Sequence, residues 1–405
     1  MTTILHQLLY KLTAIIVAVT TFFGANLSLL EADKTQWQTN YTYVFVHGLS
    51  GWGSYDSTYK IMPYWGMFGG DLMKYLGDKG FNAYAASVDP NGSAWDRACE
   101  LYAQLTGTRV DYGKAHSERC RHERYGEDFT GRALIPSFSA EDKINLLGHS
   151  FGGATTRLFA NIMEKGSAEE IAATPADELS DYFKGGKGDW IYSITSLAAP
   201  HNGTSAYHTG DNQVAEPAPS SVEEETNPVK DYFSNISNKI MSKFTGGERD
   251  DRISSDYADY DMNIDNALKL NETIITYKNT YYFSIACTAT TENADGTHSP
   301  DTKIMESIYT GTSERMGKYT GVTKGGFIID ETWLENDGLV NTVSALAPSS
   351  APSTQYVAGN VSKGIWNIMP IYHGDHMSLQ GGMTKINDVK CLYVEHLSMI
   401  NSLDR

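Results

Sequence analysis

Cysteine is scarce in this chain of 405 residues, and no Cys-x-x-Cys pair occurs. A disulfide scaffold is therefore excluded, because small domains of that kind depend on many regularly spaced cysteines. After export one bridge could form, but the sequence does not identify its partners. Free buried thiols are the simpler interpretation of the four cysteines, which are Cys99, Cys120, Cys287 and Cys391.

Positive charge is also in short supply. The chain has 32 lysines and arginines against 49 aspartates and glutamates, so its formal net charge is -17. A chain of this charge repels nucleic-acid phosphates and anionic lipid headgroups, and no local basic patch offsets the repulsion. Nucleic acid is therefore not an expected partner, and an uncharged or hydrophobic substrate fits better.

Long apolar runs are missing beyond the N-terminus. There, Lys11 precedes the apolar residues 12–23, a run near the length of the hydrophobic region of a secretory signal. No small-x-small cleavage site follows, and counting through Leu30 extends the run towards the roughly 20 residues of a membrane-spanning helix. We therefore expect residues 1–33 to be a signal peptide or a retained membrane anchor, and residues 34–405 to form an exported domain.

Segments typical of strands and helices alternate along that domain. Stretches rich in β-branched and aromatic residues predict strands, and helical spacing of apolar residues predicts helices. The alternation indicates an α/β fold with a mostly parallel, doubly wound sheet. The predicted strands are residues 41–46, 81–88, 144–147, 190–197 and 280–287, and the predicted helices are residues 71–76 and 154–164.

Two long stretches do not follow this alternation. Residues 89–136 contain a helix-like segment, 95–105, and then a segment rich in His, Arg and Glu. Residues 203–256 open with a Pro-, Ser- and Glu-rich patch and continue as an amphipathic segment, 229–244. Both stretches are predicted to be insertions, and residues 203–256 are predicted to be a lid-like one. In doubly wound folds, insertions after the carboxyl ends of strands usually cover or shape a pocket.

The motif that carries chemistry is Gly-His-Ser-Phe-Gly-Gly at residues 148–153. It matches a nucleophile elbow, in which a tight strand-to-helix turn exposes a serine to a histidine. Glycines two residues before and after Ser150 let the backbone make that turn without a side-chain clash. A short Gly-rich connection could give the same pattern by chance, so the assignment needs partners elsewhere in the chain.

The order of residues along the chain provides a test. The α/β-hydrolase fold delivers the nucleophile first, then Asp or Glu, then His. Asp337, in an Asp-Gly turn, and His376 satisfy that order downstream of Ser150. His373 and Asp330 are rival candidates, although the residues after Asp330 make it resemble a helix cap.

These residues define a mechanism and its further requirements. His376 would accept the Ser150 proton as general base, while Asp337 would fix the tautomer of the imidazole. The oxyanion then needs two preorganised N–H donors. We expect one from the backbone of Phe151, directly after the nucleophile, and the other from the backbone of Leu49, in the Gly-rich loop after the first predicted strand.

Several longer segments resemble the zinc-containing bacterial lipases of family I.5, found in Bacillus, Geobacillus and Staphylococcus, and the related clostridial esterases. They cover much of the chain from residue 41 to about residue 376. The resemblance implies an α/β-hydrolase fold and a carboxylic ester hydrolase. The matching segments are residues 47–53, 95–105, 110–113, 333–342 and 363–367.

The resemblance also implies a structural zinc site held by Asp96, His116, His122 and Asp256. On an ideal helix the two histidines would lie about 240° apart, so they can share a metal only from an irregular segment. Two carboxylates and two imidazoles complete a tetrahedron and leave no open position for water, which is typical of a structural site.

Alternatives to this ligand set remain. Cys120 lies between the two histidines and could be a ligand, and Asp259 or Asp261 could replace Asp256. The chain also departs from the family at its calcium site, which lies shortly after the catalytic histidine. Residues 377–384 contain no carboxylate, which argues against bound calcium.

The leading hypothesis is a secreted serine ester hydrolase, a lipase or esterase that acts on acylglycerols or other hydrophobic esters, aliphatic polyesters included. An amidase or thioesterase would use the same triad, and the sequence does not distinguish the three bonds. A noncatalytic surface-binding protein on a hydrolase scaffold is a third hypothesis. The intact set of Ser, Asp and His argues against it.

Overall fold

The computed structural model describes residues 32, 34–209, 252–381 and 386–405. The predicted signal peptide or anchor lies outside the described residues apart from Ala32, and so do residues 210–251 of the predicted lid-like insertion. Within the described ranges, no helix has the length and apolar character needed to cross a membrane.

The described secondary structure consists of strands, α-helices and short 3-10 helices. The strands of the main sheet are β1 (Thr42–Val46), β2 (Ala83–Ala86), β5 (Ile144–His149), β6 (Ile191–Leu197), β7 (Tyr281–Ile285), β13 (Ser353–Gln355) and β14 (Trp366–Ile368). The remaining strands are β3 (Arg109–Asp111), β4 (Tyr125–Asp128), β8 (Cys287–Thr288), β9 (Thr290–Glu292), β10 (His298–Pro300), β11 (Gly321–Val322), β12 (Ile328–Ile329) and β15 (Tyr372–His373).

The α-helices are α2 (Leu72–Asp78), α3 (Ala94–Thr106), α4 (Lys114–Cys120), α5 (Gly152–Lys165), α6 (Ala168–Ala173), α8 (Ala258–Met262), α9 (Ile264–Thr273), α10 (Ser307–Met316), α11 (Thr342–Leu346) and α12 (Ile386–Asn401). The 3-10 helices are η1 (Lys34–Gln36), η2 (Ser57–Lys60), η3 (Met67–Gly69), η4 (Asp181–Lys184), η5 (Gly188–Trp190), η6 (Ser205–Tyr207), η7 (Glu331–Trp333) and η8 (Ser378–Gln380).

A seven-stranded sheet forms the centre of the fold, and all its neighbouring strands run parallel. The strand order is β13-β14-β7-β6-β5-β1-β2. The chain thus goes from β1 to β2 on one side and then returns to β5 on the other side of β1. In open parallel sheets, ligands bind beyond the carboxyl ends of the strands at such a reversal.

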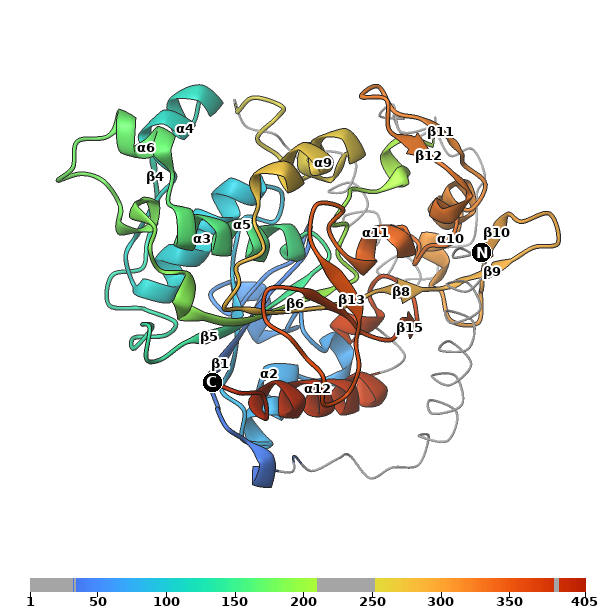
Figure 1. Cartoon of the computed structure of the whole chain (residues 1–405), viewed down its shortest axis with the longest axis horizontal. Coiled ribbons are helices and arrows are strands. Elements are labelled where there is room, and N and C mark those ends of the chain that lie inside the picture. Colours follow the sequence, from blue (N-terminus) through green and yellow to red (C-terminus); the bar gives the residue numbers. More distant parts are fainter. Residues whose placement is uncertain (1–31, 33, 210–251, 382–385) are drawn as a thin grey trace.

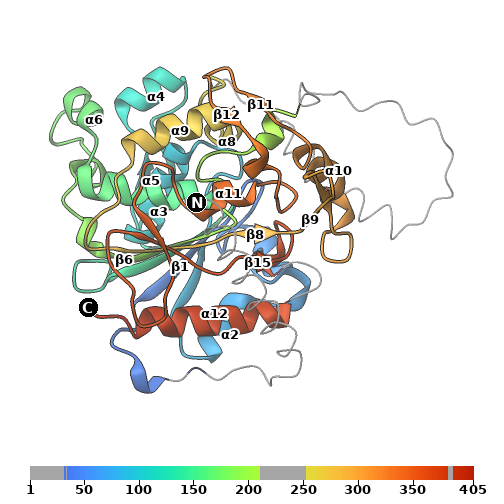
Figure 2. The ribbon, with the colours of Figure 1, turned by 45° about the vertical axis from the view of Figure 1, so that its right-hand side comes forward.

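Helices cover both faces of the sheet, with α3, α5 and α9 on one side and α2 and α12 on the other (Figures 1 and 2). Along β1, Val44 and Val46 pack into the hydrophobic cluster that contains α3 and α5, while Tyr43 and Phe45 pack into the cluster that contains α2 and α12. A strand buried on both faces is apolar at nearly every position, as β1 is.

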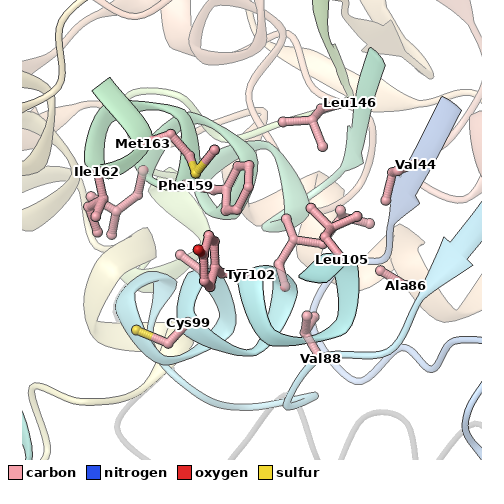
Figure 3. Packing of buried hydrophobic residues seen from close by; sticks show 14 of the residues in the cluster. Val44, Ala86, Val88, Cys99, Tyr102, Leu105, Leu146, Phe159, Ile162 and Met163 are labelled. Atoms are coloured by element: carbon pink, nitrogen blue, oxygen red, sulfur yellow. The ribbon is translucent and has the colours of Figure 1, made fainter. Parts of the chain in front are cut away.

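The side chains of the α3 and α5 layer interlock over the strands (Figure 3). Leu105 of α3 and Phe159 of α5 are fully buried in the same cluster as Leu146 of β5 and Val44 of β1. Burying a side chain of this kind contributes about 1.5–3 kcal/mol. This packing fixes the end of β5 relative to the start of α5, and the candidate nucleophile lies between them.

The predicted doubly wound α/β architecture is confirmed, and each predicted strand and helix has a counterpart whose ends shift by a few residues. The sequence did not predict β13, β14, α9, α10 or α12. The helix at the start of the predicted insertion 89–136 is α3, which packs against α5 in the central layer. The hairpin of β3 and β4, together with α4, lies outside that layer (Figure 1).

Candidate active site and metal centre

The turn between β5 and α5 places Ser150 in a left-handed backbone conformation, with φ of 55°. Such a conformation costs a non-glycine residue about 1 kcal/mol or more, so the surrounding structure must hold it. The flanking glycines are required by space: a Cβ at Gly148 would lie 2.4 Å from the carbonyl oxygen of Gly152, and a Cβ at Gly152 would lie 2.3 Å from that of Val46. This is the geometry of a nucleophile elbow.

The structure brings the three candidate catalytic side chains together. The Nε2 atom of His376 lies 2.8 Å from the Ser150 hydroxyl, and its Nδ1 atom lies 2.9 Å from a carboxylate oxygen of Asp337. All three residues are buried, although 226 and 39 positions separate the two pairs along the chain. The arrangement fits an imidazole that donates from Nδ1 to Asp337 and accepts from Ser150 at Nε2.

The turn around Asp337 explains why this carboxylate faces the histidine. One of its oxygens accepts hydrogen bonds from the backbone N–H groups of Leu339 and Val340, at 3.0 and 2.8 Å, which leaves the other for His376. The backbone N–H of His376 donates to the Asp337 carbonyl at 2.9 Å. Hydrogen bonds of both side chain and backbone therefore fix the position of His376 relative to Asp337.

The two rival residues lie elsewhere. The side chain of Asp330 caps η7 by accepting from the N–H of Thr332 at 3.0 Å, as the sequence pattern indicated. His373 is exposed on β15. Neither is among the residues that contact Ser150 in the described part of the chain.

The predicted oxyanion donors follow two neighbouring strands, β1 and β5. Leu49 is in the loop after β1 and Phe151 follows the nucleophile. Within the described ranges, the N–H groups of these two residues make no backbone hydrogen bond. N–H groups that are free of backbone partners in this way are what an oxyanion hole requires.

Sequence reasoning missed Arg97, a fully buried residue of α3. Its guanidinium donates to the backbone carbonyl of His47 and, at 3.2 Å, to that of Asp89. It also lies 5.0 Å from the centre of the Phe151 ring. Burial lowers the pKa of Arg97 to about 10, so the group stays charged at neutral pH. Arg97 thus holds the loop that carries one proposed oxyanion donor and contacts the residue that carries the other.

A second cluster of functional side chains joins α3, α4 and the segment before α8. The Nε2 atom of His116 lies 3.0 Å from an oxygen of Asp96 and 3.3 Å from an oxygen of Asp256. The Nε2 atom of His122 lies 3.8 and 3.4 Å from the same two carboxylates. A tetrahedral ion with bonds of about 2.0–2.1 Å has ligand atoms about 3.3 Å apart, close to these separations.

Unpaired polar atoms support the same interpretation. Both carboxylate oxygens of Asp256 and the Nε2 atom of His122 are buried and lack a hydrogen-bond partner in the part of the chain that the structure describes. Leaving such groups unpaired costs about 1–3 kcal/mol each, and a bound cation would satisfy all three. Asp96, His116, His122 and Asp256 therefore fit a metal ion.

The bend that this spacing requires is visible at the end of α4. The helix stops at Cys120, and Arg121 adopts a left-handed conformation with φ of 65°. This reversal brings the imidazole of His122 to 5.3 Å from that of His116, between ring centres. Two histidines six residues apart can then face one carboxylate pair.

Of the alternative ligands, Cys120 lies in the cluster and Asp261 has another role. Cys120 belongs to the same cluster, and its Sγ lies 3.8 Å from Nδ1 of His116, the ring nitrogen opposite the one that faces the carboxylates. Asp261 accepts from the backbone N–H of Ala94 at 2.8 Å and so anchors the start of α3. The pair of carboxylates that faces both histidines is Asp96 and Asp256.

The electrostatics of this cluster favour positive charge. Burial lowers the pKa of His116, but the neighbouring carboxylates of Asp256 and Asp96 outweigh it and raise the pKa to about 11. Arg252 also donates to Asp96, at 3.2 Å. Trp95 stacks on His116 with ring centres 5.1 Å apart and shields it from water. The cluster is partly shielded and acidic, and its side chains could hold a cation.

Comparison with known proteins places this fold and site. A family model described as the lipase-like C-terminal domain matches residues 39–217 and 247–394. Lipase 2 of Staphylococcus aureus is 31% identical over 369 residues, which cover 87% of this chain and 52% of that protein. The chain thus spans about half the length of this curated relative.

Solved structures agree with the sequence comparison. EstA from Clostridium botulinum superimposes with a TM-score of 0.74 at 31% identity, covering 94% of this chain and 90% of EstA. The Staphylococcus hyicus lipase superimposes with a TM-score of 0.73 at 27% identity, covering 92% of this chain and 98% of the lipase.

The sheet and its structural neighbours thus define the chain as an α/β hydrolase of the lipase and esterase class. The chain belongs to the lipase-like C-terminal domain family. The resemblance to bacterial family I.5 lipases and clostridial esterases that its motifs indicated is confirmed.

Proposed function

We propose that the chain is a serine carboxylic ester hydrolase whose triad is Ser150, His376 and Asp337. The observation that carries the proposal is the continuous pair of hydrogen bonds, 2.8 and 2.9 Å long, from the serine hydroxyl through the imidazole to the carboxylate. The names of its relatives, lipases and an esterase, support the same chemistry.

The mechanism follows from the geometry. His376 takes the proton of Ser150 as Oγ attacks the ester carbonyl, and Asp337 stabilises the imidazolium that forms. The oxyanion accepts hydrogen bonds from the N–H groups of Leu49 and Phe151. His376 then protonates the leaving alcohol. In the second half of the reaction, His376 takes a proton from water as the water attacks the acyl-enzyme. His376 then returns this proton to Oγ of Ser150, which releases the carboxylic acid and restores the serine.

We further propose that the metal site is a structural zinc site held by Asp96, His116, His122 and Asp256. Two imidazoles and two carboxylates suit zinc and balance its charge. A bound ion would join α3 and α4 to the segment before α8, and the four ligands would fill a tetrahedral site. The metal does not enter the chemistry, which Ser150 and His376 carry out.

The proposed substrates are hydrophobic esters, acylglycerols first and aliphatic polyesters as a further class. A formal net charge of -17 disfavours anionic substrates. The proposed location is outside the cell, by export through residues 1–33 or by retention at the membrane through the same segment. An amidase or thioesterase with the same triad is the second candidate, because the three side chains serve all these bonds.

The test compares the unmodified chain with Ser150→Ala on p-nitrophenyl esters from butyrate to palmitate and on emulsified triglyceride. We expect turnover by the unmodified chain and a loss of roughly 10⁴-fold or more in the variant. A p-nitroanilide of the best acyl group separates the amidase alternative. Retained activity in Ser150→Ala would exclude the proposed nucleophile, and preference for the anilide would exclude an esterase.

A further inference from the structure

A buried row of hydrogen bonds runs beneath the candidate active site. The backbone N–H of Gly48 donates to the hydroxyl of Tyr64 at 3.3 Å, and that hydroxyl lies 2.7 Å from Nδ1 of His149. The Nε2 atom of His149 lies 2.8 Å from the backbone carbonyl of His376. Tyr64 and His149 are 3% and 0% exposed, so water does not compete for these bonds.

Only one arrangement of protons satisfies every group in this row. The carbonyl of His376 can only accept, so Nε2 of His149 must carry the ring proton. Its Nδ1 atom is then a bare acceptor, and the hydroxyl of Tyr64 must donate to it. The phenol oxygen keeps a lone pair for the N–H of Gly48. Every hydrogen bond of the row therefore points the same way, from the loop after β1 to the loop of the candidate catalytic histidine.

Burial keeps the side chains of this row uncharged. It lowers the pKa of His149 to about 3, with the neighbouring His376 as a second cause, and raises the pKa of Tyr64 above its usual range. A neutral His149 matters for catalysis, because its ring centre lies 5.0 Å from that of His376. A charged His149 would repel the imidazolium that His376 forms when it takes the serine proton.

We propose that Tyr64 and His149 are positioning residues that hold His376 against Ser150 and in register with the oxyanion loop. The proposal rests on the proposed ester hydrolase function. The row of hydrogen bonds joins the three segments that would carry the chemistry: the loop of Leu49, the nucleophile turn and the loop of His376. A misplacement of about 1 Å can cost on the order of 10²-fold in rate, so this connection is worth a measurable part of kcat.

The first test is Tyr64→Phe, which removes one oxygen and keeps the ring that packs on Trp52 and Trp65. We expect kcat on a p-nitrophenyl ester to fall about tenfold, with KM within twofold of the unmodified chain. The matched control is Tyr43→Phe. Tyr43 is also fully buried, and its hydroxyl bonds to the Leu397 carbonyl and to Asn401 in the last turn of α12.

A purely structural role predicts the same behaviour in both variants, with lower thermal stability and little change in kcat per active site. We expect that behaviour from Tyr43→Phe alone. If Tyr64→Phe keeps kcat within twofold of the unmodified chain, or if both variants lose the same fraction of kcat, the positioning role is overturned.

The second test replaces His149 by Gln or by Asn, whose side-chain amides each occupy the position of one ring nitrogen. In His149→Gln the terminal amide can replace Nε2 and still donate to the His376 carbonyl. In His149→Asn the shorter amide replaces Nδ1 and loses that bond. We expect the Gln variant to keep about tenfold more kcat than the Asn variant. Equal rates, or the reverse order, would contradict the proposal.

A double variant tests whether the bonds act as one chain. Once His149→Asn has broken it, adding Tyr64→Phe should cost less than twofold more, whereas independent effects would multiply. If the losses of kcat in the two single variants multiply in the double variant, the bonds do not act as one connected row. Ester turnover that depends on Ser150 establishes the proposed function separately, so these variants can fail while the function stands. If the unmodified chain hydrolyses no ester, both proposals fall.

Discussion

At the scale of single residues, Arg97 is a buried charge in direct contact with the loop after β1. Its Nε donates to the hydroxyl of Thr155 at 2.9 Å, and its other nitrogens hold the carbonyls of His47 and Asp89. A planar fork of five donors can bind several carbonyls at once, which a lysine ammonium cannot do in the same geometry. The position of the Leu49 N–H therefore depends on this side chain.

We predict that Arg97→Met lowers kcat by about 10- to 100-fold per titrated active site, because the loop that carries one oxyanion donor loses its support. Arg97→Lys should recover only part of that loss. The matched control is Arg157→Met, since Arg157 is also buried but bonds to Asn271 rather than to the active-site loops.

Both Met variants should be less stable, so the measurement is kcat normalised to enzyme titrated with a phosphonate ester. Equal losses of normalised kcat in the two variants would show that Arg97 acts through general stability and not through the oxyanion loop.

What the sequence predicted at this scale depended on local pattern. Ser150 lies in a motif whose glycines are contiguous with it in the sequence, so it could be assigned. Asp337 and His376 followed from chain order. Arg97 and Tyr64 carry no comparable pattern, and the motif that contains His149 does not reveal its role, because the partners of all three residues lie in distant segments. Only the folded chain brings those groups together.

At the scale of elements, the metal site depends on where α3 and α4 end. Asp96 lies in the first turn of α3, and the left-handed Arg121 that ends α4 turns His122 back towards His116. Spacing alone allowed such a bend without predicting it. The resemblance to a family supplied the ligands, and the geometry of the helix end shows how this chain can present them.

We predict that His116→Ala reduces the zinc content of the purified chain from about one ion per chain to a small fraction, measured by atomic emission. A ligand present at a thousand times its Kd stabilises a fold by about 4 kcal/mol, so chelation should lower the Tm of the unmodified chain by roughly 5–10 °C. Chelation should not lower the Tm of the variant further.

The control for this experiment is His298→Ala. His298 lies on β10, where its Nδ1 contacts the Thr290 hydroxyl, outside the metal cluster. That variant should keep its zinc and its response to chelator. Undiminished zinc in His116→Ala would remove the assignment of the site.

At the scale of the whole molecule, the strands deliver distant residues to one edge of the sheet. Leu49 follows β1 and Ser150 follows β5, and these two strands are neighbours at the point where the strand order reverses. The alternation of strands and helices predicted a parallel doubly wound sheet, but not which of its strands are neighbours. The order of the C-terminal strands β13 and β14 was not predictable, because these strands are short and carry no alternating pattern.

The same fold buries four histidines that stay neutral. Burial is the largest cause in each case, and it lowers the pKa of His47 and His149 to about 3, that of His396 to about 4, and that of His201 well below its usual value. Below pH 6.5 the unfolded chain binds protons at these positions and the folded chain does not. These histidines therefore lower the free energy of unfolding as pH falls through that range, whereas burial raises the pKa of Glu100 to about 8 and that of Asp261 to about 7, and these two carboxyls contribute in the opposite direction.

His396 isolates one of these contributions, because it lies on α12 away from the candidate active site and contacts Thr195 at 2.9 Å. At pH 5, about 1.5 units below the ordinary histidine value, a group that stays neutral in the fold costs about 2 kcal/mol. We predict that the free energy of unfolding by urea drops between pH 7 and pH 5. In His396→Gln the drop should be smaller by about that amount, whatever the stability of the variant at pH 7. The exposed His373→Gln should show the full drop of the unmodified chain. An unchanged pH dependence in His396→Gln would mean that this histidine takes up its proton without unfolding the chain.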